Sequence, residues 1–178
     1  MKKWFTTLAL GLAVTASAQA QNWPPKPVTM LVPFPPGGST DLIARTVAPK
    51  LQDKFGGTFV IENKPGAGGT LGAGQAKRAA PDGYTVLVSS LGPFVIGPHL
   101  VKEPGYDALK DFEYITVAVQ APNVLVVNAN SQLRDMKGVL DYLKSNPGRM
   151  TFASAGNGTS DHLTAELFWQ ETGTQATH

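Results

Sequence analysis

The 178-residue chain has no cysteine, and it is poor in charged and aromatic residues. The absence of cysteine excludes a disulfide framework, a thiol nucleophile and a thiolate metal site. Charged residues make up 16% and aromatic residues 8% of the chain, whereas 42% is hydrophobic, a composition typical of a globular protein. Glycine and proline, with 19 and 14 copies, are frequent and indicate many turns and close backbone approaches.

The first twenty residues have the pattern of a secretory signal peptide. Lys2 and Lys3 give a basic start, and residues 6–18 form an apolar run too short to span a bilayer. The run ends at Ala18–Ala20, which fits an A-x-A cleavage site. We therefore predict a signal peptide over residues 1–20 and export from the cytoplasm, with an N-terminal membrane anchor as the alternative.

Removal of this segment would leave a formal net charge of zero, with histidine neutral. The 15 lysine and arginine residues include Lys2 and Lys3, so 13 remain beside 13 acidic residues. Nucleic acid is therefore not an expected partner, because proteins that bind it carry a basic surface.

Beyond residue 20, β-rich runs alternate with helical patterns. Strands are predicted at 28–33, 59–62, 84–90, 114–119, 124–127 and 150–153. Helices are predicted from residue 39 to Gly56, over 70–80, over 133–145 and from Ser160 onward. In the first of these helices, Ile43, Val47, Leu51 and Phe55 recur every four residues. This order of elements predicts an α/β fold with mostly parallel sheets.

A domain change is expected near residues 118–123, although an ordinary loop fits that segment equally well. It would divide the chain into a first α/β domain over 21–120 and a second α/β domain over 121–178. The chain ends after a helical segment with no closing strand, so we expect the second domain to be incomplete.

Three predicted strand-to-helix loops, 33–41, 63–69 and 154–160, are rich in glycine and small hydroxyl residues. Such loops lie at the carboxyl ends of the strands, where α/β proteins usually bind ligands. The N–H groups of a first helical turn are unpaired there, and glycine lets a ligand approach them. We therefore predict an anion site made largely of backbone amides.

The same residues also have structural interpretations. Ser39 or Thr40 could cap the first helix, and Ser160 could cap the last one. Gly72 and Gly74 lie inside a predicted helix, where glycine is unfavourable, so we expect close packing or close ligand approach at these positions.

The glycine-rich loops do not match the nucleotide-binding motifs. The pattern G-x-G-x-x-G fails at Leu71 when it is started at Gly66, and it fails at Asp161 when it is started at Gly156. The phosphate-binding pattern G-x-x-x-x-G-K-[ST] does not occur. No nucleotide cofactor is predicted.

Signals for catalysis or metal binding are weak. Ser160, Asp161 and His162 are contiguous, whereas the members of a catalytic triad converge from separate positions. His162 and Glu166 lie four residues apart, but no H-E-x-x-H pattern supports a metal site. No catalytic residue, metal or cofactor is predicted.

Several motifs, taken in order, resemble the Bug-type solute-binding proteins of tripartite tricarboxylate transporters. They are Pro33–Asp41 with Ala44–Arg45, Glu62–Gly69, Ala80–Tyr84, Leu109–Phe112, Ala153–Ser154, His162–Leu163 and Glu166–Phe168. The resemblance extends along the chain beyond residue 20.

The resemblance implies a periplasmic-binding-protein-like fold of type II, in which two domains with parallel or mixed sheets close on a ligand like a flytrap. It implies a periplasmic protein, expected to be a monomer, that captures a small organic carboxylate. The receptor would deliver this ligand to the membrane permease subunits of a tripartite transporter and would not be an enzyme.

The family's binding loops also carry over to positions of this chain. The ligand-binding residues that the resemblance implies are Phe34, Gly37, Gly38, Ser39, Thr40, Asp41, Ala67, Gly68, Gly69, Ser89, Ser90, Ser154, Gly156, Asn157, Gly158, Thr159 and Ser160.

Two other functions remain open at this point. An exported α/β hydrolase-like enzyme acting on a carboxylate or ester would need a reactive Ser154, Ser160 or His162. A ligand-sensing module for a membrane kinase would use the same cleft as a transport receptor.

Overall fold

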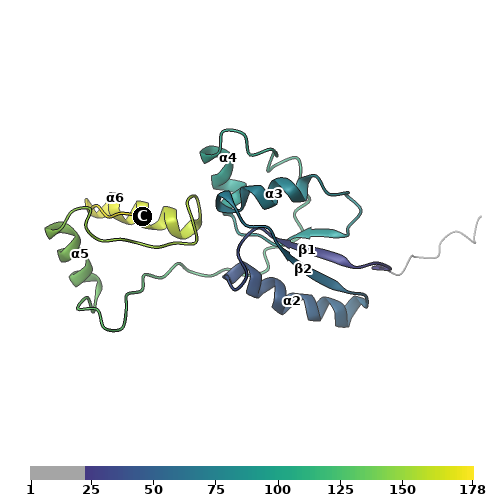
Figure 1. Cartoon of the computed structure of the whole chain (residues 1–178), viewed down its shortest axis with the longest axis horizontal. Helices are drawn as coiled ribbons and strands as arrows, with labels where there is room; N and C mark the ends of the chain where they lie inside the picture. The colour runs from purple at the N-terminus through teal and green to yellow at the C-terminus, as the bar shows by residue number, and fades with distance from the viewer. Residues whose placement is uncertain (1–22) are drawn as a thin grey trace, which may run out of the picture.

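The computed structural model describes residues 23–178, so the predicted signal peptide lies outside the described residues. Its centre is a parallel three-stranded sheet in the order β2-β1-β3 (Figure 1). The strands are β1 (Val28–Val32), β2 (Phe59–Asn63) and β3 (Thr85–Leu87). In the register, Met30 lies opposite Ile61 on one side and Val86 on the other. The predicted α/β class with a parallel sheet is confirmed, although β3 is shorter than the predicted strand over 84–90.

Helices cover both faces of this sheet. Helix α2 (Ser39–Phe55) lies on one face, and α3 (Thr70–Lys77) lies on the opposite face, directly after the 3-10 turn η2 (Ala67–Gly69) (Figure 1). Each connection between parallel strands therefore runs over one face of the sheet and contains a helix, as parallel pairing requires.

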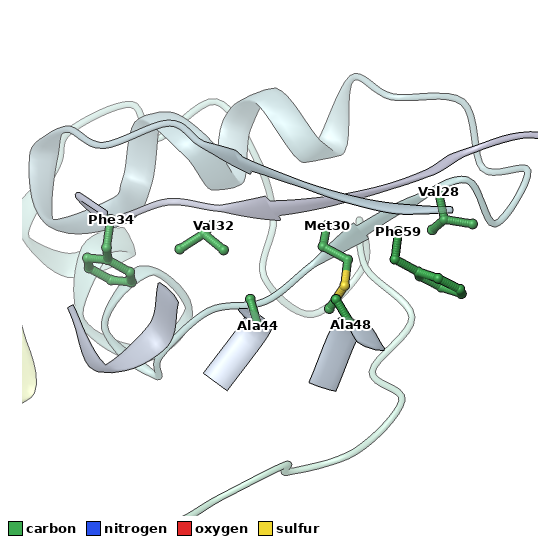
Figure 2. Close-up of a cluster of buried hydrophobic side chains, with 7 residues drawn as sticks. All are labelled: Val28, Met30, Val32, Phe34, Ala44, Ala48 and Phe59. Atoms are coloured by element: carbon green, nitrogen blue, oxygen red, sulfur yellow. The ribbon is translucent and has the colours of Figure 1, made fainter. Parts of the chain in front are cut away.

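The main hydrophobic core lies between the sheet and α2. Alternate residues of β1 face Ala44 and Ala48, which are one helical turn apart (Figure 2). The full cluster is Val28, Met30, Val32, Phe34, Ala44, Ala48 and Phe59. Val47 and Leu51 pack at its margin, whereas Phe55 is exposed, so the buried face of α2 centres on the alanines rather than on the larger apolar residues. Small alanines let the helix approach the sheet closely.

Two short helical segments follow β3 and were not predicted from the sequence. They are the π-helical turn η3 (Gly92–Ile96) and the helix α4 (Gly97–Leu100). Tyr106 packs against η3, where its hydroxyl donates a hydrogen bond to the carbonyl oxygen of Pro93. They lie beside η2, at the carboxyl edge of the sheet.

The predicted strands at 114–119 and 124–127 are wrong, because the structure has no strand there. Both segments are extended and largely exposed, and within residues 23–178 they have no neighbouring strand to pair with. The predicted strand at 150–153 reduces to one parallel bridge between Thr151 and Thr177.

The last two helices are α5 (Met136–Ser145) and α6 (Ser160–Thr172). Figure 1 shows them next to each other, joined to the sheet by a long extended segment. Leu143 of α5 and Trp169 of α6 are buried, and the Trp169 ring makes an edge-to-face contact with Phe152 at a centroid distance of 5.1 Å. None of the helices within residues 23–178 has the length and apolar character needed to cross a bilayer.

The helix caps differ from the expected ones. Gly38 is the N-cap of α2 and Thr159 is the N-cap of α6, and neither residue caps its helix through a side-chain hydrogen bond. The predicted caps Ser39, Thr40 and Ser160 are therefore wrong. Gly56 does end α2 as predicted, with φ of +70°.

Candidate functional site

The first loop (residues 33–38), which connects β1 to α2, is held by the buried carboxylate of Asp41. This side chain is 1% exposed, and its Oδ2 atom accepts hydrogen bonds from Gly37 N and Arg45 Nε, each at 2.8 Å. Its Oδ1 atom accepts from Asn63 Nδ2 at 2.9 Å, and the same amide group donates to the Phe34 carbonyl at 3.0 Å. Asp41 and Asn63 thus join the loop to both α2 and β2.

These donors also determine the charge of Asp41. The hydrogen bond from Arg45, followed by those from Gly37 and Asn63, holds the pKa of the Asp41 carboxyl well below its usual range. The carboxylate is therefore ionised at neutral pH and already has partners for both oxygen atoms. This geometry gives Asp41 a structural role in the loop.

The turn η2 has an unusual backbone. Ala67 has φ of +48°, and its neighbours Gly66, Gly68 and Gly69 have φ of +141°, +61° and +94°. An alanine in the left-handed region is uncommon and is found where the surrounding structure or a functional site enforces it. Beneath η2, a Cβ atom on Gly72 would lie 2.6 Å from Pro33 Cβ, so the predicted close packing at Gly72 is confirmed. At Gly74 the nearest atom would be 3.4 Å away, an ordinary contact.

The second loop (residues 154–160), before α6, faces η2 from the other side. A Cβ atom on Gly68 would lie 2.6 Å from the Asn157 carbonyl oxygen, so only glycine fits there without displacing the loop. A Cβ atom on Gly92 would lie 3.2 Å from the Gly158 carbonyl oxygen. Residues almost ninety positions apart in the sequence are therefore in direct contact.

A cavity of about 300 Å³ lies between these loops. It is lined by Pro33, Phe34, Pro35, Pro65, Gly66, Ala67, Gly68, Gly69, Ala155, Gly156 and Asn157. None of these lining residues has a charged side chain, so an ionic ligand would meet backbone dipoles rather than a salt-bridge partner. The volume is at the lower end of the range for small-molecule sites.

Two helices begin close to this cavity. The first hydrogen bond within α2 runs from Leu42 N to Gly38 O, so the N–H groups of residues 39–41 lie in its unpaired first turn. In α6 the first such bond runs from Leu163 N to Thr159 O. Both N-termini therefore offer backbone donors, the arrangement that favours an anion.

The N-terminus of α6 already has an anion of its own. The Asp161 carboxylate accepts a hydrogen bond from Ala155 N at 2.7 Å. Burial acts to raise the pKa of Asp161, but hydrogen bonds from Thr159, Ala155 and the first turn outweigh it, so the pKa lies below its usual value. Asp41 likewise accepts a hydrogen bond from its loop backbone, at Gly37 N, but its charge is paired with Arg45. The α2 terminus is therefore the more favourable of the two for a bound carboxylate.

Of the predicted site residues, six line the cavity: Phe34, Ala67, Gly68, Gly69, Gly156 and Asn157. The others do not line it: Gly37, Gly38, Ser39, Thr40, Asp41, Ser89, Ser90, Ser154, Gly158, Thr159 and Ser160. Of these, Ser90 lies near the η3 turn, where its Oγ would be 3.6 Å from a Cβ atom on Gly92. Sequence reasoning missed five lining residues, Pro33, Pro35, Pro65, Gly66 and Ala155, although each lies in or next to a loop that the glycine pattern had identified.

The residues considered for catalysis are placed differently from a triad. Ser154 Oγ lies 2.6 Å from His178 Nε2, while His162 Nδ1 accepts a hydrogen bond from Gly158 N at 3.2 Å. His162 Nε2 lies 3.6 Å from Glu166 Oε1. Within residues 23–178 no cluster of three or more potential metal ligands occurs.

Comparison with known proteins gives the family. Residues 43–178 match the model of the tripartite tricarboxylate transporter family receptor. Protein BugT of Bordetella pertussis is 38% identical over 161 residues, which cover 90% of this chain and 49% of BugT. The chain belongs to this receptor family, and the resemblance seen in the sequence is confirmed.

Solved structures agree with the fold. An R. palustris protein with adipate is 32% identical, with a TM-score of 0.84 over 87% of this chain and 52% of that one. MatC from Rhodopseudomonas palustris, with bound malate, is 31% identical, with a TM-score of 0.79 over 87% of this chain and 53% of MatC. The chain spans about half the length of the curated relatives it matches. Membership of a receptor family agrees with the prediction that the chain is not an enzyme.

Proposed function

We propose that the chain forms the ligand-gripping half of a periplasmic solute-binding receptor for a small organic carboxylate. The observation that carries this proposal is the cavity between η2 and the second loop, which has uncharged walls and a helix N-terminus beside it. Similar proteins solved with adipate and malate support the dicarboxylate class. Delivery of the ligand to the membrane permease subunits of a tripartite transporter and a monomeric state complete the proposal.

Backbone amides can supply the required affinity. Each charge-assisted hydrogen bond contributes roughly 1.5–3 kcal/mol, and a helix N-terminus adds roughly 0.3–2 kcal/mol. Association opposes these gains by at least about 4 kcal/mol. One loop alone would therefore bind weakly, whereas two facing loops reach micromolar affinity, about −8 kcal/mol. Movement of the second loop against η2 is the expected way to grip the ligand, with the domain boundary near residues 118–123 as its hinge.

The proposal assigns one carboxylate group to the α2 side of the cavity. There the first-turn amides of residues 39–41 and the N–H groups of Ala67 and Gly68 would donate to its oxygen atoms, whereas Gly69 N already donates to Gly66 O. Asp41 would keep the first loop in place, and Phe34 would contact the apolar part of the ligand. The predicted site residues Ser154, Gly156, Asn157, Gly158, Thr159 and Ser160 would approach from the other side, while Ser89 and Ser90 would flank the cavity.

The test is calorimetric titration of the chain with adipate, malate and citrate. We expect saturable binding of at least one of them and a loss of affinity of roughly tenfold or more in Gly68→Ala, because the added Cβ would displace Asn157. Gly173→Ala is the matched control, since Gly173 has the same φ of +61° but no atom within 4 Å of the added Cβ. Equal losses in both variants would show that backbone strain, not the loop contact, weakens binding.

A folded chain that binds none of the three acids would contradict the proposal. Turnover of a carboxylate ester abolished by Ser154→Ala would favour an exported enzyme instead. Co-purification with a membrane kinase rather than a permease would favour a sensor.

A further inference from the structure

The second loop is anchored by two histidine side chains, His162 and His178, neither of which lines the cavity. Gly158 N donates to His162 Nδ1 at 3.2 Å, and His178 Nε2 lies 2.6 Å from Ser154 Oγ. The rings of His162 and His178 are in contact, with a centroid distance of 4.2 Å. His162 is the more enclosed of the two, since its side chain is 16% exposed and His178 is exposed.

The contacts of His162 define its proton arrangement. Nδ1 accepts the Gly158 N–H, so Nδ1 carries no proton. Nε2 lies 3.6 Å from the Glu166 carboxylate, which favours the proton on Nε2. The contacts therefore select the neutral ring with its proton on Nε2, and Glu166, one turn later on α6, supports that orientation.

The Gly158 N–H belongs to the peptide unit that joins Asn157 to Gly158. In a trans peptide the N–H and the C=O point in opposite directions, so fixing one of them also fixes the other. The carbonyl oxygen of this unit, Asn157 O, is the atom that contacts Gly68 of η2 beside the cavity. His162 thus holds one side of the peptide whose other side meets η2.

We propose that His162 is a positioning residue of the binding site: its neutral imidazole orients the 157–158 peptide and so determines how the second loop meets η2. The consequence for ligand affinity rests on the proposed function above, whereas the anchoring itself does not. His162 does not line the cavity, so its effect is transmitted through the backbone.

Two amide substitutions separate this role from simple packing. In His162→Asn the side-chain oxygen can take the place of Nδ1, whereas in His162→Gln the oxygen is one carbon further out, near the place of Nε2. We expect His162→Asn to bind adipate or malate within about twofold of the parent chain, and His162→Gln to bind roughly tenfold more weakly. His99→Gln, an exposed histidine on α4, is the control and should change nothing.

Nuclear magnetic resonance of the ligand-free chain tests the anchoring without any ligand. The ¹⁵N shifts of His162 should report the Nε2–H tautomer, and the Gly158 amide should be protected from hydrogen exchange. Protection should persist in His162→Asn and be lost in His162→Gln. An Nδ1–H tautomer, or equal Gly158 exchange in the parent chain and both variants, would overturn the inference.

The binding measurement and the nuclear magnetic resonance measurement together distinguish a failure of the proposed function from a failure of the His162 proposal. If the parent chain binds no dicarboxylate but shows the tautomer and the protected amide, the proposed function fails and the anchoring stands. If the parent chain binds and both variants bind equally well, the function stands and the positioning role of His162 fails.

Discussion

The segment from β1 to α4 and the segment from residue 113 to the end contain similar apolar sequences but differ in packing. In the first segment, β-rich runs become the strands β1 and β2 and bury a continuous core. In the second, the runs 114–119 and 124–127 stay extended, and Val126 is 77% exposed. Because a strand is stabilised by its cross-strand and face-packing neighbours, the same local pattern gives a strand only where a partner lies beside it.

The largest expected effect contrasts buried and exposed valines in these two segments. Val32→Asp would place an unpaired carboxylate in the β1 core, where Val32 is 0% exposed, and should lower the free energy of unfolding by at least about 3 kcal/mol. Val126→Asp should change it by less than about 0.5 kcal/mol. Urea denaturation followed by circular dichroism measures both, and similar losses in the two variants would mean that residues 124–127 are packed after all.

Asp41 should make the stability of the folded chain depend on pH in the acid range. A carboxyl group whose pKa is lowered by folding contributes stability above its unfolded pKa, and this contribution is lost as the pH falls toward the folded value. For Asp41 the ordinary pKa is 3.8, so the chain should lose stability progressively below about pH 4. Asp41→Asn should be less stable than the parent at neutral pH but should lack this part of the acid dependence. Urea midpoints at several pH values test it, and parallel acid dependences would contradict it.

Packing under η2 should give a smaller effect. Gly72→Ala would bring a methyl group within 2.6 Å of Pro33 Cβ and 2.7 Å of the Lys64 carbonyl, so we expect a loss of about 1–3 kcal/mol. Gly74→Ala, two residues further along α3, meets only ordinary contacts and should be neutral or stabilising by up to about 1 kcal/mol. Thermal unfolding of the pair measures the difference, and equal midpoints would contradict the close contact.

The smallest effect is expected at the start of α5, in the less densely packed segment. Asp135 Oδ1 accepts a hydrogen bond from Gly138 N at 2.7 Å and caps the helix. Asp135→Ala should therefore cost about 1 kcal/mol. Asp141→Ala removes only an exposed ion pair with Lys137 and should cost less than about 0.5 kcal/mol. If Asp141→Ala proves the more damaging in urea denaturation, the capping interpretation is wrong.

The sequence predicted the elements of the first segment well because local and tertiary signals agree there. Hydrophobic runs, glycines after helices and proline-rich turns identified β1, α2, β2 and α3 to within a few residues. The strands at 114–119 and 124–127 were wrong because pairing is a tertiary property that no local pattern contains. The turn η3 and the helix α4 were missed because they are short, and each has proline at its start.

The candidate site was predicted at the level of loops but not of atoms. The glycine pattern identified η2 and the second loop, and the structure brings them together around one cavity. The roles of individual residues depended on contacts that are distant in sequence. Asp41 could be assigned to the first helical turn, but its bonds to Gly37 and Asn63 appear only in the folded chain.

If facing backbone loops of this chain hold a small dicarboxylate, as we propose, the amide groups of those loops should respond when the ligand is added. The most direct measurement is a titration of the ¹⁵N-labelled chain with adipate and malate, followed by amide chemical shifts. We expect saturable shifts concentrated in residues 37–41, 67–69 and 154–162. A folded chain with no amide shifts, or with shifts confined to other residues, would contradict it.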